Sequence, residues 1–121
     1  MENLDIIKIA ANALNDKKAH DIVAIKISDL TILADYFIIC TANSSTQLRA
    51  LCDEVDEKLK EAGVTPHHIE GKATGWVALD YGSVVIHVFG RNEREFYGLD
   101  KIWSDGELLQ LSEILNNITE D

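Results

Sequence analysis

The sequence lacks both a long hydrophobic run and a cluster of basic residues. A helix that crosses a bilayer takes roughly 18 or more consecutive apolar residues, and no run in these 121 residues approaches that length. Lys and Arg number 11 against 21 Asp and Glu, a net charge of −10. Nucleic-acid binding generally needs a cationic face. The composition therefore disfavours a membrane span and direct nucleic-acid binding, and it fits a basic protein partner. An acidic excess that serves solubility alone explains the charge equally well.

Cysteines are also scarce. Cys40 lies in an apolar run and Cys52 falls on the apolar side of a predicted helix. Two cysteines cannot form a disulfide framework, so we expect both to be small buried hydrophobic residues in a reducing compartment. The first five residues are acidic and lack the basic region of a secretory signal. We therefore expect a cytoplasmic protein.

The apolar spacing predicts a single domain over residues 1–121, with a core of 4–106 and a C-terminal extension of 107–121. Helical spacing indicates a first helix over 3–15 and a second that begins after a Ser44 cap and ends at Gly63. A third, short helix is expected between a cap at Asn92 and Trp103. The extension keeps helical spacing at Leu108, Leu111, Leu115 and Ile118.

Five short segments read as strands: 22–27, 34–41, 67–70, 75–80 and 83–89. The run at 36–40 is apolar on both faces, so this strand should be central and covered by helices. The last two strands are joined by a short turn and should form an antiparallel hairpin. The order of elements predicts an α/β (α+β) fold, with a mixed sheet of about five strands and helices packed on it.

Aromatic and charged residues gather between Gly75 and Trp103. Alternation along a strand places Trp76, Ala78 and Asp80 on one face and Val77, Leu79 and Tyr81 on the other. Aromatic residues ringed by charge are typical of protein–protein hot spots. One face of the strand can serve the core, so the other is either covered by another element or available to bind a partner.

Catalytic and metal-binding motifs are not recognisable. His67 and His68 are adjacent and would point to opposite faces of a strand. His87 lies in an apolar strand, where a hydrogen-bonded core histidine is the simpler interpretation. A two-metal site needs two carboxylates together, whereas Asp35 and Asp80 each stand alone. We predict no cofactor, no metal and no catalytic residue.

Several motifs nevertheless resemble those of one family, the ribosomal silencing factors, also called iojap-like proteins. The resemblance covers residues 4 to 106, and the motifs occur in the same order. They lie at 35–41, at Asn43-Ser44 with Gln47, at 75–82, at 84–89, at Arg94 and at 96–105.

This resemblance implies a nucleotidyltransferase-like fold without an active site. It also implies that the protein binds the large ribosomal subunit at its fourteenth protein and blocks joining of the small subunit. Translation is thereby repressed under nutrient limitation. The basic character expected of that ribosomal protein suits an acidic chain. We expect the contacts to come from Trp76, Leu79, Asp80, Tyr81, Glu93, Tyr97 and Asp100.

Two points stay open at this stage. Trp76 and Leu79 point to opposite faces of a regular strand, so both can reach one partner only if the strand is an edge, twists or bulges. An edge strand could instead pair with a strand of the partner. The alternative function is a divergent nucleotidyltransferase-fold enzyme that uses Asp35 or Asp80 with a divalent ion. A homodimer of the free protein is compatible with the first function.

Overall fold

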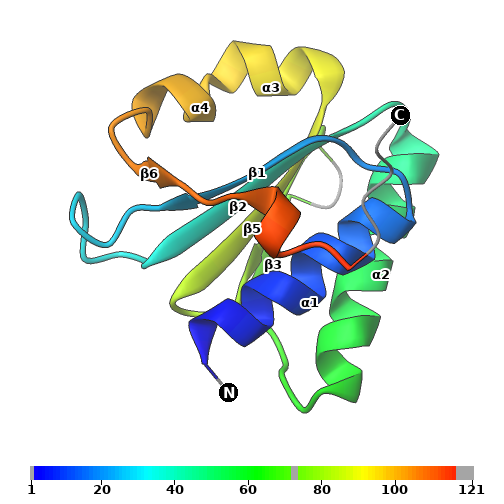
Figure 1. Cartoon of the computed structure of the whole chain (residues 1–121). Helices are drawn as coiled ribbons and strands as arrows, with labels where there is room; N and C mark the ends of the chain where they lie inside the picture. Colours follow the sequence, from blue (N-terminus) through cyan, green and yellow to red (C-terminus); the bar gives the residue numbers. More distant parts are fainter. Residues whose placement is uncertain (1, 72–73, 117–121) are drawn as a thin grey trace.

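The computed structural model describes residues 2–71 and 74–116 and contains one mixed sheet with helices on both faces (Figure 1). The helices are α1 (Asn3–Asp16), α2 (Ser45–Glu61), α3 (Arg91–Tyr97) and α4 (Leu99–Ile102), followed by a 3₁₀ turn, η1 (Leu111–Glu113). The strands are β1 (His20–Lys26), β2 (Tyr36–Ala42), β3 (His68–Glu70), β4 (Trp76–Asp80), β5 (Val84–Gly90) and β6 (Glu107–Leu108). No helix within the described ranges is long and apolar enough to cross a membrane.

The second helix forms for the reasons that its sequence indicates. The Ser44 hydroxyl accepts a hydrogen bond from the Gln47 backbone N–H at 3.0 Å, which satisfies one free donor of the first turn. Gln47 also accepts a hydrogen bond from the Asn43 N–H at 2.6 Å. At the other end, Gly63 adopts a φ of +85°, the left-handed conformation that commonly ends a helix.

The sheet has the strand order β3-β4-β5-β2-β1-β6. The central pair, β2 and β5, is parallel, and the other pairs are antiparallel. The expected mixed sheet is therefore confirmed, and all five predicted strands are present. The sixth strand is an addition, because Glu107 and Leu108 pair with Lys26 and Ile25 of β1.

The two faces of the sheet are covered very differently. Helices α1 and α2 lie side by side on one face and α3 and α4 lie on the other (Figure 1). The α1/α2 face forms the main core, which joins both helices to the inward side chains of β2, β4 and β5. Cys40 is fully buried there and half-buried Cys52 packs beside it, as expected for free thiols in a core.

Three sequence predictions need correction. The third helix begins at Arg91 with Gly90 at its cap, so the Asn92 cap is wrong, and Gly98 (φ +60°) divides it into α3 and α4. Leu108 lies in a strand and Leu111 in a 3₁₀ turn, because edge pairing with β1 overrides the helical spacing. Leu4, placed on the buried face of α1, is 59% exposed. Ile118 lies outside the described residues.

Candidate partner-binding surface

Strand β4 presents its two sets of side chains to different environments. Val77 and Leu79 are buried at 1% and 0% exposure in the core beneath α1 and α2. Tyr81 follows them into the same core at 5% exposure. Trp76 and Asp80 lie half-buried on the opposite face. Strand alternation is therefore confirmed, and the face that is free to bind carries Trp76.

This geometry corrects two of the predicted contact residues. Leu79 and Tyr81 have no accessible side chain to offer, because both fill the core against the helices. Strand β4 is paired with β3 on one side and β5 on the other, so it is not an edge strand. It can neither turn both faces to one partner nor pair with a partner strand.

Trp76 is the centre of an aromatic cluster. Its ring centroid lies 4.6 Å from that of Tyr97 and 5.0 Å from that of Phe89, with which it stacks. The indole N–H donates a hydrogen bond to Nδ1 of His87 at 3.1 Å. Phe89 is fully buried, whereas Tyr97 is 44% exposed. The cluster therefore anchors Trp76 from below and leaves an aromatic rim at the surface.

His87 is a core histidine, as the sequence suggests. It is 6% exposed, and burial lowers its pKa from 6.5 to about 4, a shift that nearby Asp80 partly opposes. The ring is therefore neutral at neutral pH. Because Nδ1 accepts the Trp76 N–H, the proton lies on Nε2, which has no hydrogen-bond partner among the described residues. His87 supports Trp76 and provides no metal or catalytic group.

Glu93 joins the same surface from the first turn of α3. Its side chain packs over Gly75, where an added Cβ would lie 2.3 Å from the Glu93 Cδ. Gly75 immediately precedes Trp76, and Tyr97 lies one helical turn after Glu93. No hydrogen bond or ion pair of the Glu93 carboxylate is found within residues 2–71 and 74–116. Glu93 therefore places a carboxylate beside the aromatic cluster, with no ion-pair partner in the part of the chain that the structure describes.

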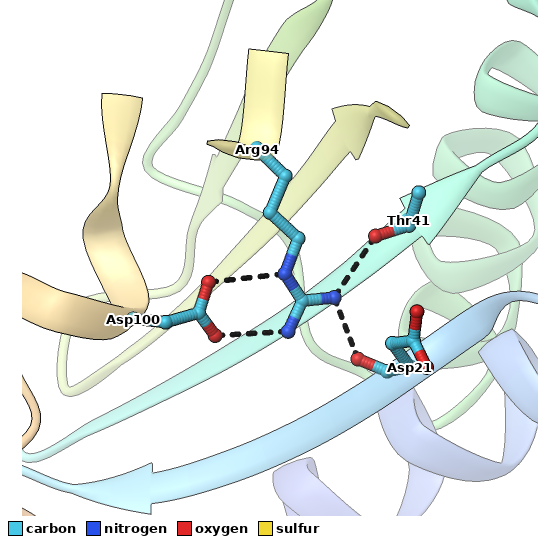
Figure 2. Close-up of polar contacts among 4 residues, drawn as sticks. All are labelled: Asp21, Thr41, Arg94 and Asp100. Carbon is cyan, nitrogen blue, oxygen red and sulfur yellow. Dashed lines mark hydrogen bonds and ion pairs between the residues drawn. The ribbon is translucent and has the colours of Figure 1, made fainter. Parts of the chain in front are cut away.

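Asp100, a predicted charge partner, is already paired within the chain (Figure 2). Its carboxylate accepts two hydrogen bonds from the Arg94 guanidinium, at 3.0 Å from Nε and 2.9 Å from Nη2. The hydrogen bonds from Arg94 lower the pKa of Asp100 below its usual value. Asp100 therefore has an ion-pair partner within the chain, but its side chain is still 44% exposed, so its contact with a partner stays a prediction.

The remaining sequence candidate, Asp80, lies at the far end of β4 from Trp76. Its Oδ1 accepts a hydrogen bond from the Gly82 N–H at 2.8 Å, and the residue is half-buried. Between these two residues lies the small, half-buried Ala78. We define the Trp76 surface as Trp76, Ala78 and Asp80 of β4 together with Glu93, Phe96 and Tyr97 of α3.

Two members of this surface, Ala78 and Phe96, are absent from the predicted contact set, and the larger and more exposed of the two is Phe96. It is 81% exposed and meets Tyr97 edge-on at a centroid distance of 5.1 Å. Its spacing in a predicted helix favoured a core role. In the structure Phe96 lies on the exposed side of α3, which ends at Gly98.

The chain also has the crevice that this topology creates at the carboxyl ends of parallel strands. A hollow of about 500 Å³ lies between the first turns of α2 and α3, with Glu93 as its acidic lining residue. Asp35 and Asp80 both lie at the opposite end of β2 and β5, as the pairing of Tyr36 with Val84 and of Asp80 with Val85 shows. Asp35 accepts a hydrogen bond from Asn3 of α1, whereas Asp80 lies on the other face with Trp76. No group of three or more potential metal ligands occurs among the residues that the structure describes.

Fold and surface together define a small α+β domain with an aromatic and acidic surface at β4 and α3. A family model described as "Ribosomal silencing factor during starvation" matches residues 1–121. The chain therefore belongs to the ribosomal silencing factor family, which confirms the resemblance. Members of this family are regulators and not enzymes.

Individual relatives support the same family assignment. The ribosomal silencing factor of Bacillus subtilis is 41% identical over 112 residues, which are 92% of this chain and 95% of the relative. A crystal structure from Chromobacterium violaceum superposes with a TM-score of 0.83 at 40% identity, over 86% of this chain and 88% of that one. The mouse protein named "Mitochondrial assembly of ribosomal large subunit protein 1" is 32% identical over 88% of this chain and 50% of its own length.

Proposed function

We propose that the protein binds the large ribosomal subunit through the Trp76 surface, at the subunit's fourteenth protein, and prevents the small subunit from joining. The observation that carries the proposal is an aromatic surface with the Glu93 carboxylate beside it, on a chain of net charge −10. Such a surface suits a basic protein partner, because the aromatic side chains supply contact area and the acidic ones supply complementary charge.

The contact residues follow from exposure. Trp76 and Tyr97 are the aromatic anchors, and Phe96 extends them at the rim. Glu93 and Asp80 lie on either side and provide the negative charge. The mechanism is steric: a bound domain occupies the face that the small subunit would meet, and no covalent chemistry takes place. We propose that this occurs in the cytoplasm and that it lowers translation when nutrients are limiting.

Sedimentation with purified large subunits tests the binding step. The protein should pellet with the subunits at low salt and less so as salt rises, since charge attraction is screened. Asp80→Lys should weaken binding. Asp53→Lys is the matched control, because it makes the same charge change at an exposed residue of α2, on the other face of the sheet. A wild-type protein that stays in the supernatant at low salt would contradict the proposal.

Light scattering on mixing the two subunits tests the blocking step. Large subunits that carry the protein should join small subunits more slowly and to a lower extent than free large subunits do. Unimpeded joining at saturating protein would remove the steric mechanism while leaving the binding step intact.

We further propose that the free protein forms a homodimer through the same exposed aromatic side chains. Sedimentation equilibrium should then show a mass that rises with concentration in the wild type and falls toward that of a monomer in Phe96→Ala. A monomer at all concentrations would disprove the dimer without affecting the ribosomal function.

A further inference from the structure

The helix that carries half of the Trp76 surface packs weakly by itself. Helix α3 has seven residues, none of them fully buried. Its two aromatic residues, Phe96 and Tyr97, are 81% and 44% exposed. Short helices are marginal in water unless tertiary contacts hold them. Something other than an apolar stripe must therefore fix α3 on the sheet.

Arg94 makes the contacts that can do this (Figure 2). From the middle of α3 its guanidinium reaches α4 through Asp100, and its Nη1 donates to the Thr41 hydroxyl of β2 at 2.9 Å and to the Asp21 carbonyl of β1 at 2.7 Å. The side chain is only 15% exposed. One residue thus connects the helix to three separate elements.

The backbone of β1 is shaped to receive it. The register with β2 shifts between His20 and Val23, and Asp21 adopts a φ of +51°, which L-residues seldom do. A bulge of this kind takes residues out of the ladder. The Asp21 carbonyl has a donor there in Arg94, and Thr41, at 5% exposure, is a buried hydroxyl that the same guanidinium satisfies.

We propose that Arg94 is a positioning residue for partner binding: its hydrogen bonds to Asp100, Thr41 and Asp21 hold α3 where Tyr97 meets Trp76 and Glu93 packs over Gly75. This inference rests on the proposed function for its binding consequence, but its structural part concerns the free protein alone. This set of contacts requires a planar guanidinium group. Its Nε and Nη2 donate two parallel hydrogen bonds to the Asp100 carboxylate, and its Nη1 donates to two further acceptors. Lysine cannot reproduce that pattern.

The first test is made on the free protein. Nuclear Overhauser contacts between the Trp76 and Tyr97 rings, and hydrogen exchange of the α3 amides, are compared in wild type, Arg94→Lys and Asp100→Asn. Both variants should lose ring contacts and exchange faster in α3, with α1 and α2 unchanged. Asp100→Glu, which keeps the carboxylate, should recover part of the wild-type behaviour. Asp100→Asn leaves the guanidinium and the other two acceptors in place. This variant therefore still tests the positioning role if Arg94→Lys does not fold.

The second test measures affinity for purified large subunits at equal folded fractions. Arg94→Lys should bind at least about tenfold more weakly, the scale of losing one strong interface contact. The matched control is Arg91→Gln, also on α3, whose exposed side chain makes one hydrogen bond, to Asn43. This variant should retain wild-type affinity and ring contacts.

Two results would overturn the inference. Unchanged Trp76–Tyr97 contacts in both Arg94→Lys and Asp100→Asn would show that the Arg94 hydrogen bonds do not position α3. Lost binding with unchanged ring contacts would make Arg94 a direct contact instead. If the wild type itself fails to bind large subunits, the proposed function fails, while the measurements on the free protein still decide the positioning role.

Discussion

The two faces of the sheet differ in how they are covered. On one face, α1 and α2, with 14 and 17 residues, bury apolar side chains against β2, β4 and β5. On the other, α3 and α4 have seven and four residues, and α3 buries none of its side chains fully. The first face holds the domain together through apolar burial. The second face buries smaller apolar clusters, around Ile27 and around Phe89 and Leu99, and it leaves aromatic and acidic groups accessible. We propose that recognition uses this second face.

The largest effect on stability is expected on the α1/α2 face. Leu51 of α2 is fully buried, so Leu51→Ala should lower the free energy of unfolding by about 4 kcal/mol through lost burial and the cavity it leaves. Urea denaturation followed by circular dichroism measures this. The folded fraction should still bind large subunits with wild-type affinity. A loss of affinity per folded molecule would show that the two faces are not separate.

Trp76→Ala should lower the affinity for large subunits, which Leu51→Ala is expected to leave unchanged. The anchor of the Trp76 surface is removed, and affinity for large subunits should fall by about 2 kcal/mol, roughly thirtyfold. Sedimentation binding at several protein concentrations gives the dissociation constant. Trp76→Phe keeps a stacking ring but lacks the N–H that His87 accepts, so it should retain more affinity than the alanine variant. Equal affinities for all three proteins would contradict the assignment.

The support beneath Trp76 should make stability depend on pH. His87 has a folded pKa of about 4 against an unfolded value of 6.5, so the unfolded state binds the proton first as pH falls. Stability is therefore lost from pH 6.5 downward, by about 2 kcal/mol between pH 7 and pH 5. Unfolding curves at both pH values, for wild type and His87→Gln, should show this difference only in the wild type.

The pH range in which stability is lost distinguishes His87 from the Arg94–Asp100 ion pair on the same face. Asp100 has a lowered folded pKa, so its contribution is present above its unfolded value of 3.8 and is lost only below it. An Asp100→Asn variant should therefore keep the wild-type slope between pH 7 and pH 5. A pH dependence that persists in His87→Gln would point to another group.

The smallest effect is expected at the rim. Phe96→Ala removes a side chain that is 81% exposed, so the free energy of unfolding should change by no more than about 0.5 kcal/mol. Affinity for large subunits should nevertheless fall measurably, by less than for Trp76→Ala. Denaturation and sedimentation of the same preparation provide both values. A Phe96→Ala variant with a lower free energy of unfolding but unchanged affinity for large subunits would contradict this assignment.

The main elements could be predicted because local signals agree with the fold. The 3.6-residue spacing of α2, its Ser44 cap and Gly63 all point the same way. Strand alternation at 76–81 correctly separated the Trp76 face from the Leu79 face. The family could be recognised from motifs that span most of the chain.

What could not be predicted depends on contacts between distant residues. The burial of Leu79 follows from helices that pack on one side of a strand that is interior to the sheet. The internal pairing of Asp100 depends on where α3 and α4 place Arg94. Strand β6 has two residues and exists only because β1 offers it an edge. No local pattern encodes these arrangements.

The separation of the two faces is tested most directly by hydrogen exchange on the complex with purified large subunits. Amides of β4 and of α3–α4 should exchange more slowly in the complex than in the free protein. Those along α1 and α2 should exchange at the same rate in both states. Slowing confined to α1 and α2, with β4 and α3–α4 unaffected, would contradict the account.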